Sequence, residues 1–166
     1  IDSSLVIEAD GMTILDANDT KTFGFSLKQI LSNHRKIDFV LRSHSSASPL
    51  PHCIKGSKPE ESSRSKLAYA SEFSYFCSKT KAKYAIPFAS SHYYLHENTK
   101  KYNKYYSNPN FVKSVHEEII NQDEQKCVLM PSGSSYSKKY GFNLIDHNYD
   151  DIDEHIKQGI KKHHKK

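Results

Sequence analysis

The chain contains 166 residues, 36% of them hydrophobic, and carries a formal net charge of +5 at pH 7. This length suits one domain with a substantial core and is too short for two domains of the usual size, so we expect a single domain over residues 1–166. The 11 Tyr and 8 Phe exclude a disordered chain, and no apolar run approaches the ~18 residues that a membrane span needs.

Cysteine usage and the ends of the chain bear on its setting. Cys53, Cys77 and Cys127 lie far apart and form no CxxC pair, which favours a reducing, cytoplasmic compartment over a disulfide framework or a zinc knuckle. The start lacks a signal-peptide pattern, and because residue 1 is Ile rather than Met we expect a fragment or a processed product. Much of the basic excess lies in lysines at the C-terminal end, which is typical of a solvated helix tail.

The first 33 residues predict a β-hairpin and a short helix. The β-rich runs 4–9 and 13–17 flank Asp10-Gly11, a pair that accommodates positive φ in tight turns. Ser26 is a plausible N-cap for a helix to about residue 33, because Leu27, Ile30 and Leu31 share one helical face.

Strands and helices alternate along the rest of the chain. The expected elements are a buried strand at 37–41, a long Ser/Pro-rich surface loop at 43–65, a helix at 61–81, a strand at 84–87, a helix at 109–122, a strand at 126–130 and a helix at 151–163. The inward residues are expected to be Leu67, Ala70, Phe73, Phe76 and Cys77 in the second helix, and Phe111, Val115, Ile119 and Ile120 in the third. This alternation predicts an α/β layered domain, and the opening hairpin makes the sheet mixed.

The second hairpin strand ends in Asp16, Asn18 and Asp19, where side chains leave the sheet and can converge on a ligand. The residues alone leave open that these three are only turn formers.

Residues 5–19, LVIEADGMTILDAND, resemble the hairpin that opens the second half of metallo-β-lactamase-fold proteins. The pattern is most similar to the branch that contains CMP-N-acetylneuraminate hydroxylase and N-acylphosphatidylethanolamine phospholipase D. A second match is YAIPFASSHYYLH at 84–96, in which His96 follows Pro87 at the spacing of the branch's metal-binding histidine. Weaker similarities at 38–51 and 128–133 extend the resemblance over roughly residues 4–135.

The resemblance implies the C-terminal half of a metallo-β-lactamase-like αββα sandwich, with helices on one face of the sheet. It implies that Asp19 and His96 are metal ligands, and that the complete enzyme holds zinc or iron, two ions in all. Metal-bound hydroxide would attack an ester, lactone, amide or phosphodiester in a small-molecule substrate. Iron-dependent oxygenation is the variant that the hydroxylase similarity implies.

The family's first half supplies a His-x-His-x-Asp-His loop that this sequence lacks, and Ser134 stands where the family's Pro-Gly-Asp turn has its aspartate. Because a catalytic zinc needs about three protein ligands, we expect the isolated chain to be inactive. The partner would be the missing N-terminal half, or a second copy meeting the open sheet face. A noncatalytic half-domain that serves as a binding or assembly module stays open.

His44, Ser46, His92 and Asn103 are candidate pocket residues, since they lie near the two matched motifs. For the histidines and the serine, an ordinary structural side chain is the competing interpretation. Tyrosines and lysines alternate over 93–106, which superficially resembles a surface for single-stranded nucleic acid. Since no known binding module accompanies them, we do not expect a nucleic-acid partner.

Overall fold

A computed structural model describes residues 3–18, 20, 23–45, 65–90 and 93–163 of the chain. The central feature is a five-stranded sheet in the order β1-β2-β3-β4-β5. Its strands are β1 (Leu5–Ala9), β2 (Met12–Asn18), β3 (Phe39–Arg42), β4 (Tyr84–Pro87) and β5 (Lys126–Cys127). β1 pairs antiparallel with β2, whereas β2 to β5 pair in parallel. The expected α/β class with a mixed sheet is confirmed.

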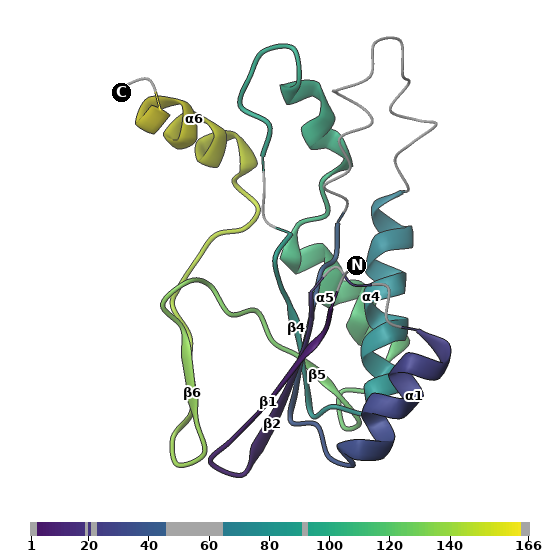
Figure 1. Ribbon diagram of the computed structural model, residues 1–166. Helices are drawn as coiled ribbons and strands as arrows, with labels where there is room; N and C mark the ends of the chain where they lie inside the picture. The colour runs from purple at the N-terminus through teal and green to yellow at the C-terminus, as the bar shows by residue number, and fades with distance from the viewer. Residues whose placement is uncertain (1–2, 19, 21–22, 46–64, 91–92, 164–166) are drawn as a thin grey trace.

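Three helices cover one face of this sheet (Figure 1): α1 (Gly24–Asn33), α4 (Lys66–Thr80) and α5 (Pro109–Ile119). The core lies between them and the strands. Leu15, Val40 and Ala85 from three neighbouring strands meet Phe73 and Phe76 of α4, and all five are almost fully buried. Burial of side chains of this size drives the layers together, at about 1.5–3 kcal/mol for each large one.

The opposite face of the sheet is covered only in part. A hairpin of β6 (Ser135–Ser137) and β7 (Gly141–Asn143) lies there, apart from the three helices (Figure 1). Its Tyr136 and Phe142 pack on Phe39 and Tyr84, the first residues of β3 and β4, with ring centres 4.8–6.1 Å apart. Further along this face, Leu5 and Ile7 of β1 stay 57% and 41% exposed.

Two further elements lie beyond the carboxyl ends of the strands (Figure 1): the 3₁₀ helix η1 (Lys100–Tyr105) and the last helix, α6 (Ile152–His163). The carboxylate of Asp150 accepts hydrogen bonds from the side chains of Asn108 (2.7 Å) and Asn110 (2.8 Å). This pair ties the segment before α6 to the first turn of α5.

Several element boundaries differ from expectation. α1 begins at Gly24 after Phe23, with no side-chain cap, so Ser26 is not its N-cap. α4 begins at Lys66, where the Ser65 hydroxyl accepts from the Ala68 backbone N–H. The strand expected at 126–130 ends at residue 127, the third helix ends at residue 119, and β6, β7 and η1 were not expected.

The prediction of which residues face inward was also partly wrong for two helices. Leu67 at the start of α4 is 56% exposed, and Ile119 on α5 is 52% exposed. α5 instead buries Val112 and His116 together with the expected Val115. Phe111 lies to one side of this buried face and Ile119 is the last residue of α5, so both stay exposed although both are apolar.

No helix among the described ranges combines the length and the apolar character needed to cross a bilayer.

Candidate functional site

The carboxyl ends of β2, β3 and β4 are joined edge to edge by backbone hydrogen bonds. The N–H of Ser43 donates to the carbonyl of Asn18 (2.8 Å), and the N–H of Phe88 donates to that of Arg42 (2.9 Å). Parallel strands that end together present their following residues at one edge, where ligands bind in α/β sheets. Asp19 directly follows β2, but its side chain lies outside the described residues.

Two non-glycine residues at this edge adopt left-handed backbone conformations. Asn18 has φ of 41° at the end of β2, and Ala89 has φ of 52° just beyond β4. Asn tolerates this region, but in Ala the Cβ approaches the following carbonyl, which costs roughly 1–2 kcal/mol. Strain of this kind persists where the surroundings impose it, and it clusters at functional sites.

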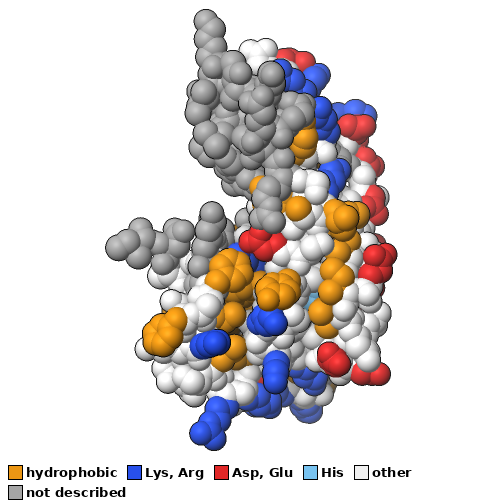
Figure 2. Space-filling model, turned by 90° about the vertical axis from the view of Figure 1, so that its right-hand side faces the viewer, with side chains coloured by type: hydrophobic (Ala, Val, Ile, Leu, Met, Phe, Trp, Pro, Cys, Tyr) orange, Lys and Arg blue, Asp and Glu red, His pale blue; other side chains and the backbone are white. Residues whose placement is uncertain are grey.

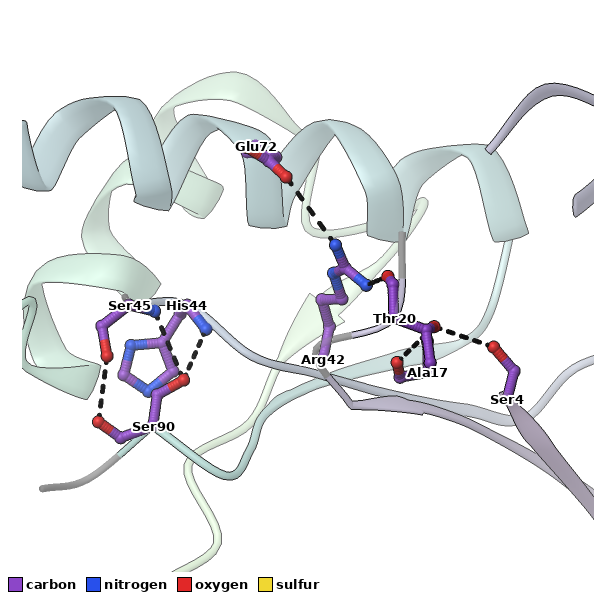
Figure 3. Close-up of polar contacts among 8 residues, drawn as sticks. All are labelled: Ser4, Ala17, Thr20, Arg42, His44, Ser45, Glu72 and Ser90. Carbon is purple, nitrogen blue, oxygen red and sulfur yellow. Dashed lines mark hydrogen bonds and ion pairs between the residues drawn. The ribbon is translucent and has the colours of Figure 1, made fainter. Parts of the chain in front are cut away.

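Arg42 is the buried cation of this edge, with 4% of its surface exposed. Its guanidinium lies 4.5 Å from the centre of the Phe76 ring and 5.6 Å from that of Phe23. It donates to the backbone carbonyl of Thr20 and forms an ion pair of 3.7 Å with Glu72 of α4 (Figure 3). A buried guanidinium needs such partners because desolvation of the charge is costly.

Arg42 thereby holds Thr20, two residues beyond the end of β2. Thr20 donates to the carbonyl of Ala17 through both its backbone N–H (2.9 Å) and its hydroxyl (2.7 Å), and that hydroxyl lies 3.0 Å from the Ser4 hydroxyl (Figure 3). The residues on both sides of position 19 are therefore held by hydrogen bonds to the sheet.

A second set of polar contacts joins the ends of β3 and β4. The Ser90 hydroxyl accepts from the backbone N–H groups of His44 (2.8 Å) and Ser45 (3.3 Å), and the Ser45 hydroxyl donates to the Ser90 carbonyl (3.0 Å). Figure 3 shows the His44 imidazole directed toward Ser90. The His44 side chain is 2% exposed, so this candidate pocket residue is part of the buried edge rather than of an open wall.

His96 lies in an exposed turn before η1. Its Nδ1 accepts from the backbone N–H of Asn98 (3.2 Å), and its carbonyl accepts from the N–H groups of Thr99 and Lys100. A neutral imidazole that accepts at Nδ1 carries its proton on Nε2, whereas a ligating histidine normally donates its second ring N–H. Metal binding through Nε2 therefore requires the ring to turn away from Asn98.

Asn103 is 8% exposed, and its side-chain amide pairs with the backbone of Tyr94 in both directions, at 2.8 and 2.9 Å. It thereby anchors the segment that leads to His96. Asn103 also lines a cavity of about 740 Å³ between η1 and α6, next to Glu97 and Lys100 in the turn after His96. Of the four candidate pocket residues, Asn103 is the one that borders this cavity, while Ser46 and His92 lie outside the described residues.

Aromatic side chains hold α6 beside this region. Tyr93 stacks on His155 of α6 with ring centres 6.0 Å apart and contacts Tyr106 at 4.8 Å. Burial raises the pKa of Tyr93, and the hydrogen bond to Tyr106 opposes that shift. Tyr93 is therefore an uncharged packing residue at neutral pH.

The described part of the chain contains no group of three or more His, Cys, Asp or Glu side chains placed to hold a metal ion. His96 stands alone, and its ring is oriented for a backbone hydrogen bond. The described residues by themselves therefore do not fit a zinc or iron site, and further ligands would have to come from Asp19 and from outside this part of the chain.

Comparison with protein families, curated proteins and solved structures finds no match to this chain. The resemblance of residues 4–135 to the metallo-β-lactamase fold thus remains a prediction from the motifs.

Sequence reasoning missed Arg42, Thr20 and Ser90, which build most of the described edge. Arg42 offered one signal, a charged residue directly after the apolar run 39–41. Its burial between Phe23 and Phe76 depends on side chains that are far apart in sequence.

Proposed function

We propose that this chain is one half of a metal-dependent hydrolase, with its site at the carboxyl ends of β2 and β4. Asp19 and His96 would contribute ligands to zinc or iron, and the remaining ligands would come from a separate N-terminal half. The substrate would be a small molecule with an ester, lactone, amide or phosphodiester bond. Turnover would then require both halves.

The observation that carries this proposal is the left-handed conformation of Ala89 at the end of β4. It falls within the matched motif, seven residues before His96, and it redirects the chain at the edge where ligands bind in parallel sheets. The position of Thr20 supports the same edge, because Arg42 holds the carbonyl of this residue, which directly follows Asp19 in the sequence.

The cavity beside η1 supports a small-molecule substrate. Its volume of about 740 Å³ lies within the usual range of ligand pockets, about 300–1,000 Å³. Lys66, Lys100 and Lys157 line it together with Asp150 and Asp153, so its walls offer polar partners of both signs.

The alternative is a noncatalytic assembly module, which the exposure of Leu5 and Ile7 favours. Together with Ile14 and Leu41, they lie on the face of the sheet opposite the three helices. An N-terminal half, or a second copy, that covers this face would bury them.

We further infer a reducing, cytoplasmic setting, supported by the buried free thiols of Cys77 and Cys127.

The deciding experiment measures metal content and turnover of the full-length protein, together with four single variants. Asp19→Ala and His96→Ala should each lower bound zinc or iron and abolish hydrolysis of a chromogenic phosphodiester, ester or lactone, while the folding transition barely changes. Ser46→Ala and His92→Ala should do much less.

His34→Ala is the matched control for His96→Ala, because His34 is a surface histidine engaged with Glu8 (2.8 Å) and remote from the edge. Metal lost in His92→Ala but kept in His96→Ala would mean that the histidine spacing is misassigned. Absence of bound metal from the full-length protein, with all variants unchanged, would contradict the hydrolase and leave the assembly module.

A further inference from the structure

The end of the sheet opposite the candidate site carries several exposed basic residues. Four parallel strands begin there, and exposed cations stand at three of the starts: Arg35 and Lys36 before β3, Lys83 before β4 and Lys126 at the start of β5. Figure 2, which views the side of α1 and α4, shows several blue Lys and Arg side chains over the lower part of the molecule, with red acidic side chains at the lower right.

The tip of the β6–β7 hairpin adds an exposed aromatic ring to this basic end. Lys138 donates to the carbonyl of Asp10 in the β1–β2 turn, which fixes the tip against the same end of the sheet. The next two residues project outward: Tyr140 is 78% exposed, and Lys139 Nζ lies 4.8 Å from the centre of its ring. The aromatic packing of Tyr136 and Phe142 on Tyr84 makes the hairpin a firm support for this tip.

The acidic groups nearby do not cancel these charges. Asp38 is 14% exposed in its side chain, and its carboxylate is engaged by the backbone N–H of Thr13 (2.9 Å) and by Lys36 (3.5 Å). Asp10 lies in the β1–β2 turn, and Glu8 beside it pairs with His34 (2.8 Å). Asp123 and Glu124 precede β5 and offset Lys126 at the far edge of the sheet. The remaining cations are Arg35, Lys36, Lys83, Lys138 and Lys139, and they outnumber Glu8, Asp10 and Asp38, so the surface around the hairpin tip carries a net positive charge.

We propose that this end of the molecule docks on an anionic lipid bilayer, with Tyr140 entering the headgroup region and Lys138, Lys139, Lys36 and Lys83 contacting acidic headgroups. A ring with one apolar side and a polar tip suits the membrane interface, and each Lys or Arg held near an anionic surface strengthens binding about fivefold. Because the basic residues surround a projecting tip rather than line a groove, they fit a flat surface better than a nucleic-acid strand. Docking in this way would direct the candidate site away from the bilayer.

The test is sedimentation of the full chain with vesicles of phosphatidylcholine alone and of phosphatidylcholine mixed with phosphatidylserine. We expect binding to the mixed vesicles only, weakening as salt rises. K138E/K139E should reduce binding at least tenfold, and Tyr140→Ser severalfold. K161E/K162E, which makes the same change in net charge on exposed lysines of α6, should bind as the unaltered chain does.

A second readout uses the absence of Trp from the chain. In Tyr140→Trp, the single indole should shift its emission to the blue on mixed vesicles and be quenched by brominated lipid, as expected for a ring within the headgroup region. Circular dichroism confirms that each variant is folded. Equal losses for K161E/K162E and K138E/K139E, no sedimentation with mixed vesicles, or a tip-dependent affinity for a single-stranded oligonucleotide above that for vesicles would each overturn the proposal.

Discussion

The imidazole of His116 meets the ring of Phe73 edge-on, with ring centres 5.8 Å apart, where α5 packs on α4. His116 is fully buried, and neither ring nitrogen has a hydrogen-bond partner among the described residues. Burial lowers the pKa of His116 to about 4, and the nearby Gln125 backbone opposes this shift only in part. The helix pair therefore requires a neutral imidazole.

The pH dependence of stability follows from this lowered pKa. In the unfolded chain a histidine titrates near pH 6.5, and in the folded protein His116 has a pKa of about 4. The free energy of unfolding is therefore unaffected by His116 above pH 6.5, and it falls by roughly 3 kcal/mol as the pH decreases toward 4. In His116→Leu this part of the acid loss should disappear, whereas His34→Gln, at a more exposed position, should keep it. Urea midpoints measured at several pH values check both variants; an unchanged acid loss in His116→Leu would contradict the assignment.

Removal of Arg42 should loosen the turn after β2. Arg42→Met retains much of the volume but leaves the Thr20 carbonyl and the Glu72 carboxylate without the guanidinium, which should lower the free energy of unfolding by roughly 2–4 kcal/mol. Glu72→Gln should cost about 1 kcal/mol or less, because Glu72 is partly exposed. Urea unfolding gives the magnitudes, and faster amide exchange of Thr20 in Arg42→Met would locate the effect.

Because the backbone at Ala89 is strained, replacing this residue with glycine should raise the free energy of unfolding. With φ of 52°, Ala89→Gly should relieve about 1 kcal/mol of strain, offset in part by glycine's larger unfolded-state entropy, and raise stability by roughly 0.5 kcal/mol. Ala85→Gly is the matched control, since Ala85 is fully buried in the extended strand β4, and this variant should lose at least about 1 kcal/mol. A loss of similar size in both variants would show that Ala89 is not strained.

Loss of the hydrogen bonds from Asn108 and Asn110 to Asp150 should change local mobility rather than global stability. Asp150→Ala and Asn110→Ala should each free the segment before α6 and increase proteolysis and amide exchange there, with little change in the main unfolding transition. Asn108→Ala should additionally cost about 1 kcal/mol of global stability, because Asn108 also caps α5 by accepting from the Phe111 N–H (3.0 Å). Asp146→Ala serves as the control, because Asp146 is an exposed carboxylate that does not bond to Asn108 or Asn110.

Local chemistry made much of the fold predictable. Asp10-Gly11 adopts the positive φ angles that its residues favour, and β4 ends at Pro87 as expected. The apolar spacing of α4 placed Phe73, Phe76 and Cys77 correctly in the core. In each case the information lies within a few neighbouring residues, where turn preference or periodicity acts directly.

Tertiary structure decided the rest. The β6–β7 hairpin was missed because its strands are short and polar, and its stability comes from Tyr136 and Phe142 packing on Phe39 and Tyr84 across the chain. Arg42 is likewise buried only because Phe23 and Phe76 enclose it and Glu72 pairs with it. For the site, the sequence pointed to the ends of β2 and β4, but the contacts that Arg42 and Ser90 make at this edge join residues 22 to 46 positions apart. No local pattern encodes such contacts, since they arise when the sheet brings separate strand ends together.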